Sequence, residues 1–409
     1  MTGDPGHPFA DFSGTGNTVH TANAYVRKLI LDSLRYWVTE MHVDGFRFDL
    51  ASVFARDEQG AIEVRRPGIF ADISSDPLLS SVRLIAEPWD NGGGYHLGRS
   101  FPGLTWAQWN GAFRDDLRRF VRGEAGLVPV LMTRLYGSDD LFPDDRMHAF
   151  HPYQSVNYVT CHDGFTLYDL VSYDRKRNWA NGHANEDGVE QNYSWNHGWE
   201  GDVDVPAEVR ALRARQVRNY CCLLLLANGT PMLRAGDEFL QTQRGNNNPY
   251  NQDNETSWLD WSGLDEHADI HRFFRGMIAF RKSHPSLCRS RFWRDDIHWH
   301  GTEASPDLGP ESRTLAFLLE GSSQGDDDLY VMINGSEEDR RFAIQVEDFR
   351  EWRRIVDTAL SSPNDIVDPG GEVPLSGPEY GVRARSVVVL CRWRRPSAVD
   401  ADGRPVRLR

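Results

Sequence analysis

Four short apolar stretches with strand character alternate with helical patterns, and this order restricts the fold more than any other feature of the chain. The strand-like stretches lie at residues 43–50, 82–89, 155–163 and 230–237. Apolar residues recur at helical spacing over 24–41, 112–136, 206–227 and 269–283. Strands that are separated by helices run parallel to one another in one sheet. The sequence therefore predicts an α/β domain that extends over residues 1–290.

The first strand carries charges where a core strand should have none. Side chains alternate along a strand, so Arg47 and Asp49 share one face while Phe46 and Phe48 share the other. Arg47 is placed to pair with Asp49, because a buried carboxylate is costly unless it has a partner. Taken alone, the pattern fits a structural ion pair as well as an active site.

Three acids stand at or just beyond strand ends: Asp49, Glu87 and Asp163. Active sites of parallel α/β proteins gather at the carboxyl ends of the strands. Glycoside hydrolysis requires at least two carboxyl groups that face each other across the sugar. Glu87 follows three apolar residues, a setting that favours a proton-bearing acid, whereas Arg47 should keep Asp49 ionised as a nucleophile.

The composition excludes several classes of partner. A net charge of -15 argues against a nucleic-acid groove and against an anionic membrane surface. The 13 Trp, 13 Tyr and 20 Phe residues suit a neutral, polyhydroxylated ligand such as a sugar. We find no signal peptide, no apolar run long enough for a membrane helix and no metal-ligand spacing, and five cysteines form no disulfide framework. We therefore expect a cytoplasmic protein that needs no cofactor.

The last quarter of the chain has a different character. Strand-like runs at 314–320, 328–334, 341–346 and 384–392 are separated by turn-rich segments. This pattern predicts an all-β antiparallel sandwich domain over residues 291–395, followed by a disordered tail at 396–409. Asp326–Asp328 is expected to form a solvated hairpin turn, with calcium binding there as a minor alternative.

Three motifs resemble successive motifs of the α-amylase superfamily (glycoside hydrolase family 13): Asp-Gly-Phe-Arg-Phe-Asp at 44–49, Ala-Glu-Pro-Trp-Asp at 86–90 and Val-Thr-Cys-His-Asp at 159–163. The resemblance implies that Asp49 is the nucleophile, Glu87 the general acid/base and Asp163 a carboxylate that helps to distort the sugar. It further implies that Arg47 orients Asp49 and that His162 binds substrate hydroxyls. We add Trp89 to the expected substrate-binding residues.

Residues 163–174, 192–198 and 245–261 resemble the bacterial glycogen debranching and isoamylase group, as does the loop at 11–18. Members of that group cut α-1,6 branch points in glycogen or its limit dextrins, so the resemblance implies a retaining debranching hydrolase acting on branched α-glucan. Two alternatives remain open at this point. One is an α-glucan transferase of the same superfamily, and the other is an inactive truncated fragment that retains only glucan binding.

The superfamily has a (β/α)8 TIM barrel, and this chain resembles strands four to eight of it, followed by the C-terminal β domain. The motif of the third strand, which supplies a supporting Asp and His, has no counterpart in the sequence. We therefore expect this chain to form part of a barrel, with the missing N-terminal half of the barrel as its partner. A parallel sheet without its neighbouring strands has an open edge.

Several polar and aromatic residues allow two interpretations each. Asp90 lines the site or holds a turn, and the run Asn246–Asn248 binds sugar hydroxyls or shapes a loop. Six tryptophans stack on sugars or fill the core: Trp106, Trp109, Trp195, Trp199, Trp258 and Trp261.

Overall fold

The chain forms two compact units in this computed structural model. The first comprises residues 1–111 and 137–157, and the second comprises residues 112–136 and 158–409. The structure describes residue 6 and residues 9–393, apart from 58, 64, 66, 67, 146 and 148. The expected disordered tail at 396–409 and the last two residues of the expected β domain lie outside the described residues.

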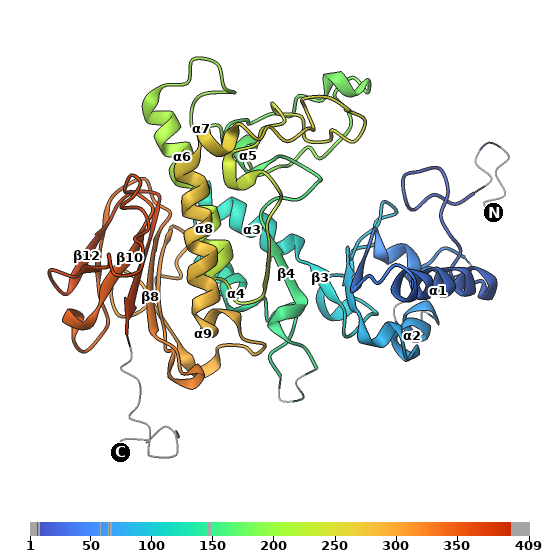
Figure 1. Ribbon diagram of the computed structural model, residues 1–409, viewed down its shortest axis with the longest axis horizontal. Coiled ribbons are helices and arrows are strands. Elements are labelled where there is room, and N and C mark those ends of the chain that lie inside the picture. The colour runs from blue at the N-terminus through green and yellow to red at the C-terminus, as the bar shows by residue number, and fades with distance from the viewer. Residues whose placement is uncertain are drawn as a thin grey trace. The chain divides into compact units, whose positions relative to one another are not determined.

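A parallel sheet forms the centre of the first unit (Figure 1). Neighbouring strands pair in the order β1-β2-β3-β4, each pair in parallel. The elements of this unit are α1 (Ala24–Thr39), β1 (Gly45–Phe48), α2 (Gly68–Ser75), β2 (Arg83–Ala86), β3 (Ala107–Trp109) and β4 (Ser155–Tyr158), whose last residue already belongs to the second unit. The predicted alternation of helices and parallel strands is therefore present.

The strands are shorter than the sequence pattern predicts. β1 ends at Phe48 rather than at residue 50, because Leu50 has a left-handed backbone (φ 41°) that turns the chain. Asp49 thus lies in the turn after the strand and does not share a strand face with Arg47. Gly45 is required in β1, since a Cβ atom there would come within 2.5 Å of the Arg83 carbonyl oxygen on β2.

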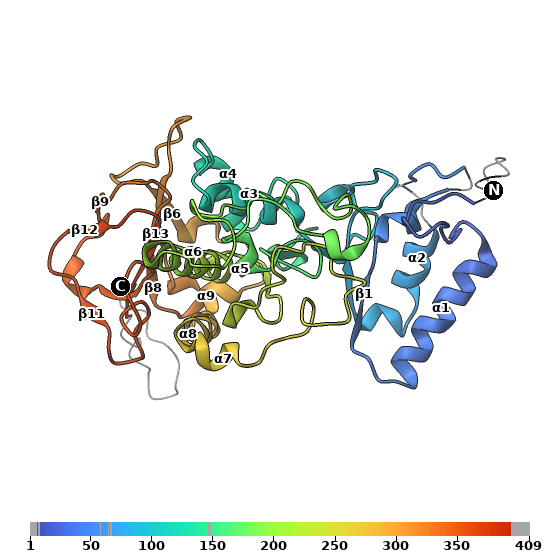
Figure 2. The same cartoon turned by 90° about the horizontal axis from the view of Figure 1, so that it is seen from above.

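Helix α1 covers this sheet with one face only. It begins after Asn23, whose side chain accepts a hydrogen bond from the Tyr25 N–H. Leu34 is buried in a core shared with Phe48, Phe70 and Trp106, and Figure 2 shows α1 and α2 beside β1. Five large apolar side chains of α1 and the following loop nevertheless stay exposed: Tyr25, Leu29, Tyr36, Trp37 and Met41.

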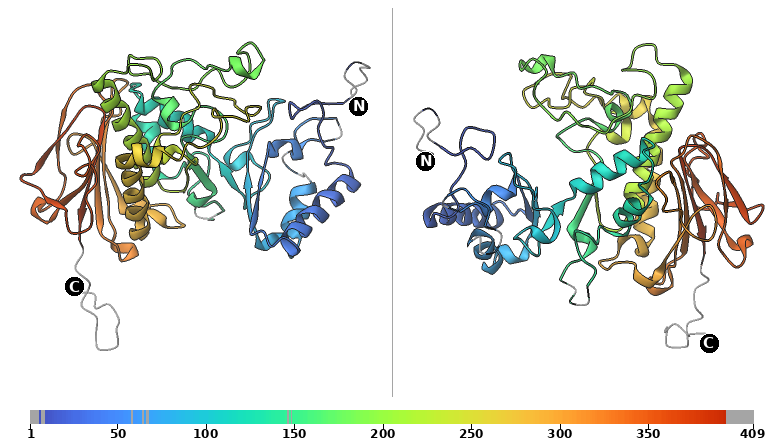
Figure 3. Two further views of the ribbon diagram at one scale, coloured as in Figure 1. Left: turned by 45° about the horizontal axis from the view of Figure 1, so that its top comes forward. Right: turned by 180° about the vertical axis from the view of Figure 1, so that it is seen from behind.

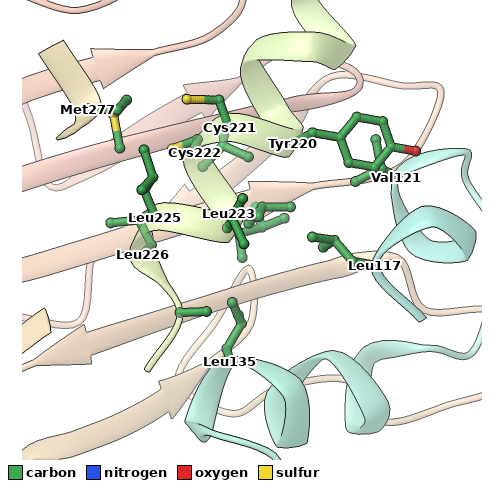
Figure 4. Packing of buried hydrophobic residues seen from close by; sticks show 14 of the residues in the cluster. Leu117, Val121, Leu135, Tyr220, Cys221, Cys222, Leu223, Leu225, Leu226 and Met277 are labelled. Carbon is green, nitrogen blue, oxygen red and sulfur yellow. The ribbon is translucent and has the colours of Figure 1, made fainter. Parts of the chain in front are cut away.

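The second unit is built around α6 (Ala207–Leu226), which begins directly after Pro206, one residue later than predicted. Its C-terminal half is buried on every side, and Figure 4 shows Leu223, Leu225 and Leu226 pointing in different directions from the helix. Cys221 and Cys222 are free and belong to the same apolar core. The other elements here, up to residue 288, are α3 (Gly111–Val121), α4 (Val128–Tyr136), α5 (Leu167–Leu170), β5 (Thr230–Met232), α7 (Gly263–Glu266), α8 (Ala268–Ser283) and α9 (Pro285–Cys288). The helix expected over 112–136 is therefore divided into two.

The C-terminal part of this unit contains an antiparallel sheet of six strands, in the order β11-β10-β13-β8-β7-β6, and a two-stranded sheet, β12-β9. The strands are β6 (Ile297–His300), β7 (Thr314–Leu319), β8 (Asp328–Asn334), β9 (Arg340–Ala343), β10 (Arg353–Asp357), β11 (Val373–Pro374), β12 (Glu379–Val382) and β13 (Ser386–Arg392). Four of these were predicted. β6, β10, β11 and β12 were not, because they are short, with two to five residues each, and lack a continuous apolar run.

The six-stranded sheet is the middle of three layers. Alternate residues on β8 face opposite sides, so that Leu329 and Val331 join the core around α6 while Tyr330 and Met332 pack against the two-stranded sheet. Figure 3 shows α6 and α8 running along the six-stranded sheet in both views.

Asp169 on α5 is buried and ties the loop after β5 to the core. Its Oδ1 atom accepts a hydrogen bond from the Thr242 hydroxyl (2.5 Å) and its Oδ2 atom accepts one from the Gln243 N–H (2.9 Å). Burial raises the pKa of Asp169 to about 7. Within the described part of the chain, none of the helices combines the length and apolarity that crossing a membrane requires.

Candidate active site

Arg47 holds two of the predicted catalytic acids. Its Nη1 atom lies 2.6 Å from Oδ1 of Asp49, and its Nη2 atom lies 3.1 Å from Oε1 of Glu87. β1 and β2 are adjacent and in register, with Phe48 opposite Ala86, so Asp49 and Glu87 follow neighbouring strands at equivalent positions. The structure therefore brings Arg47, Asp49 and Glu87 together at one end of the sheet.

The two carboxylates have different surroundings. The side chain of Glu87 is 3% exposed, whereas that of Asp49 is 72% exposed. Oε2 of Glu87 also accepts a hydrogen bond from the Leu50 N–H (2.7 Å). The sequence suggested an apolar setting for Glu87, but a cation and a backbone donor hold it, and both favour the ionised carboxylate. An acid role for Glu87 requires that substrate binding change these contacts.

Leu50 has a strained backbone where it contacts Glu87. A left-handed conformation costs a residue with a Cβ atom roughly 1–3 kcal/mol. The turn is anchored on both sides, since the Ala51 N–H donates to the Glu87 carbonyl (2.8 Å) and the Glu87 N–H donates to the Phe48 carbonyl (3.0 Å). The left-handed backbone points the Leu50 N–H toward the Glu87 carboxylate.

Trp109 at the end of β3 supports Arg47 from the neighbouring strand. The guanidinium carbon of Arg47 lies 4.3 Å from the centre of a Trp109 ring, a cation–π contact. The sequence placed Trp109 among residues that either stack on sugars or fill the core, and it missed the three-residue strand that positions this tryptophan. Its aromatic neighbour in sequence, Trp106, is a core residue.

Trp89 and Asp90 follow Glu87 in the next turn of the chain. The Trp89 ring stacks on Tyr95 with centres 6.0 Å apart, and Tyr95 is exposed. Asp90 is buried and pairs with Arg56, so its turn-holding interpretation fits the structure better than a place in the site. Its carboxylate also accepts hydrogen bonds from the N–H groups of Gly92 and Gly94, both at 2.9 Å.

His162 and Asp163 belong to the second unit, in the loop that follows β4. Both side chains are more than half exposed, and Nε2 of His162 lies 3.6 Å from Oδ1 of Asp163. The loop is attached through Asp237, which accepts hydrogen bonds from the Thr160 hydroxyl and from the Leu167 N–H. Exposed side chains on an anchored loop are available to a ligand.

The asparagine run at 246–248 has a structural role. Asn246 and Asn247 are buried, and the Asn178 side chain donates to Oδ1 of Asn247 (2.8 Å) and accepts from its N–H (3.0 Å). The run therefore shapes a loop, one of its two interpretations. Among the described residues, His, Cys, Asp and Glu side chains form no group of three able to hold a metal ion. Asp326 and Asp328 are engaged by His284 and Arg392.

Comparison with known proteins assigns the family. The model of the α-amylase catalytic domain matches residues 10–267, and the chain belongs to this family. The model of the isoamylase C-terminal domain matches residues 299–391, a range that includes most of the two antiparallel sheets. The predicted resemblance to debranching members of the α-amylase superfamily is confirmed.

Two groups of curated relatives are similar over most of the chain. Isoamylase 3, chloroplastic, of Oryza sativa subsp. japonica is 44% identical over 93% of this chain and 48% of its own length. A glycogen operon protein GlgX homolog of Mycobacterium tuberculosis is 42% identical over 93% of this chain and 55% of its own length. The chain thus spans about half the length of the curated relatives it matches.

Solved structures support the fold. Pullulanase from Bacillus acidopullulyticus superposes with a TM-score of 0.67 at 23% identity, covering 94% of this chain and 42% of that one. The Bacillus subtilis type I pullulanase complexed with maltose has the same TM-score, 0.67, at 21% identity, covering 95% of this chain and 49% of that one. The architecture is an α-amylase catalytic domain with a C-terminal β-sheet domain.

Proposed function

We propose that the chain belongs to a debranching enzyme that hydrolyses α-1,6-glucosidic linkages of glycogen or limit dextrin with retention of configuration. Asp49 attacks the anomeric carbon, and Glu87 protonates the leaving oxygen and then activates water. Asp163 binds and distorts the sugar, while His162 and Trp89 contact its hydroxyls and its ring. The relatives are isoamylases and glycogen operon proteins, which supports this substrate class.

The observation that carries the proposal is the bridge that Arg47 makes between Asp49 and Glu87. Retaining glycosidases need two carboxyl groups about 5–5.5 Å apart, one ionised and one able to carry a proton. A guanidinium in contact with both acids keeps them close together. The two side chains differ strongly in exposure, and the acid role of Glu87 further requires that substrate binding change its contacts with Arg47 and with the Leu50 N–H.

We further propose that the parallel sheet is the part of a (β/α)8 barrel that corresponds to strands four to eight, with the catalytic domain at 1–290 and the β-sandwich at 291–395. The exposed apolar side chains of α1 support this, because they suit a helix with neighbours on a second face. Within the described residues, β1 pairs with β2 and with no other strand. A cytoplasmic location stays a prediction, and the isoamylase of Oryza sativa described above is chloroplastic.

The test is incubation of the purified chain with glycogen limit dextrin, followed by measurement of new reducing ends and released linear oligosaccharides. Debranching that disappears in Asp49→Asn and in Glu87→Gln is expected, and near-normal turnover in Asp49→Asn would refute the assigned nucleophile. A redistribution of branch and chain lengths without new reducing ends would indicate transfer instead. Glucan binding without turnover would favour the binding-only alternative.

A further inference from the structure

A pocket in the second unit lies outside the groups assigned to catalysis. It is formed by the loop that follows β5 and by α7, and it has a volume of about 340 Å³. Ligand-binding pockets generally have volumes of roughly 300–1,000 Å³. Its polar and aromatic lining includes Thr242, Arg244, Glu255, Trp258, Glu266 and His267.

A hydrogen bond orients the Trp258 side chain. Its indole N–H donates to Oδ1 of Asp253 (3.0 Å), so the polar edge of the ring is already satisfied. The backbone at this position is fixed by Gln241, which is buried: its amide donates to the Trp258 carbonyl (2.8 Å) and accepts from the Asp260 N–H (2.9 Å). The residue is nevertheless 58% exposed. A rigid support that presents an exposed aromatic ring is suited to a ligand with an apolar face.

The charged side chains around Trp258 provide both donors and acceptors. Arg244 and Glu255 are exposed, and both line the pocket. Arginine offers five N–H donors in a planar fork, and a carboxylate only accepts. Glu255, Asp260 and Glu266 outnumber Arg244, which disfavours an anionic ligand. A neutral ring with an apolar face and hydroxyl groups at its edge fits this combination.

The pocket is connected to the predicted substrate site through the loops. Asp237, close before Phe239 and Leu240 in the pocket lining, accepts a hydrogen bond from the Leu167 N–H (2.9 Å) in the segment that follows Asp163. The loops after β4 and β5 are thus fixed to each other within the second unit. Neither Asp163 nor His162 lines the pocket.

We propose that this pocket is a second binding site for glucosyl units of an α-glucan chain, with Trp258 as its stacking platform and with Arg244 and Glu255 as its hydroxyl-binding groups. The substrate class rests on the proposed function. The site would retain a long outer chain while another part of the same glucan is at the acids, so it favours long chains over short ones.

Direct binding tests the inference without any need for turnover. The full chain is titrated with maltoheptaose by calorimetry, and its migration is compared in native gels with and without glycogen. Trp258→Ala should weaken the Kd for maltoheptaose about 10-fold, equivalent to about 1.4 kcal/mol, because both the aromatic contact and the apolar area that it buries are lost. Glu255→Gln and Arg244→Gln, which alter exposed side chains only, should each weaken binding about 3-fold.

Trp179→Ala is the matched control, because Trp179 is 68% exposed in the same unit and does not line the pocket. It should leave the Kd within a factor of two. An unchanged Kd in folded Trp258→Ala, or equal losses in Trp258→Ala and Trp179→Ala, would overturn the proposal. If Asp49→Asn retained turnover, the catalytic assignment would fail, while Trp258-dependent binding would still support the pocket.

Discussion

The pair of Asp90 and Arg56 should decide whether the first unit stays folded. The Asp90 carboxylate is fully buried and accepts from Arg56 Nε (3.0 Å), Arg56 Nη2 (2.9 Å) and two backbone N–H groups. Asp90→Ala leaves the guanidinium of Arg56 without its partner, although this side chain is only 9% exposed. Breaking a buried pair in this way costs about 3–5 kcal/mol.

The loss caused by Asp90→Ala is large compared with the usual stability of a domain. A free energy of unfolding of about 5–15 kcal/mol is typical, so Asp90→Ala should remove a large fraction of the stability of the first unit. Phe12 stacks on Arg56, with the guanidinium carbon 3.7 Å from the ring centre, and this contact should be lost as well. Asp49 and Glu87 belong to the same unit, so we expect turnover to fall together with the folded fraction.

Amide hydrogen exchange followed by mass spectrometry can measure this effect unit by unit. Protection should fall in β1 and β2 of Asp90→Ala, while β8 and β13 in the second unit keep theirs. The control is Lys28→Met, which removes the exposed ion pair with Asp32 and should cost less than about 1 kcal/mol. The reasoning is refuted if Asp90→Ala loses under about 1 kcal/mol, or if the double change Asp90→Leu with Arg56→Met is more damaging than Asp90→Ala.

Three further outcomes are expected. Arg47→Lys should lower kcat about 10- to 100-fold in a debranching assay, because an ammonium group cannot bridge two carboxylates while stacked on an aromatic ring; an unchanged kcat would count against the bridge. Leu50→Gly should preserve kcat, since the backbone N–H makes the contact with Glu87, and it should raise thermal stability by relieving the left-handed strain. Folding favours protonated Asp169, so its stabilising contribution is full below pH of about 4 and is lost as the pH rises through about 7. Asp169→Asn should reduce the loss of unfolding free energy with rising pH, measured by urea titration between pH 5 and 8. An equal dependence of the unfolding free energy on pH in both proteins would contradict the attribution of this loss to Asp169.

The sequence predicted the parts of the fold that depend on local periodicity. The helix at 206–227 and the strand at 328–334 were found within one or two residues, because their apolar patterns are long. β3 was missed, since three residues are too few to show a period. The strand at 43–50 was drawn too long, because alternation does not reveal that Leu50 adopts a left-handed backbone.

The candidate site was predicted as residue types and not as contacts. The motifs indicated Asp49, Glu87 and Arg47, and the expectation that Arg47 pairs with Asp49 is met. The contact between Arg47 and Glu87 depends on the register between β1 and β2, which is a tertiary property. For the same reason the sequence could not show that Trp109 lies against Arg47 or that the Leu50 N–H binds Glu87.

The six-stranded sheet has a consequence for how this family of proteins can be recombined. Leu315, Ile333 and Val389 of that sheet share one apolar core with Leu223 of α6, although the isoamylase C-terminal model begins only at residue 299. Exchanging this region between relatives would replace one wall of the core that encloses α6. A chimera joined near residue 290 should therefore fold only when the donor sheet matches the helix in shape.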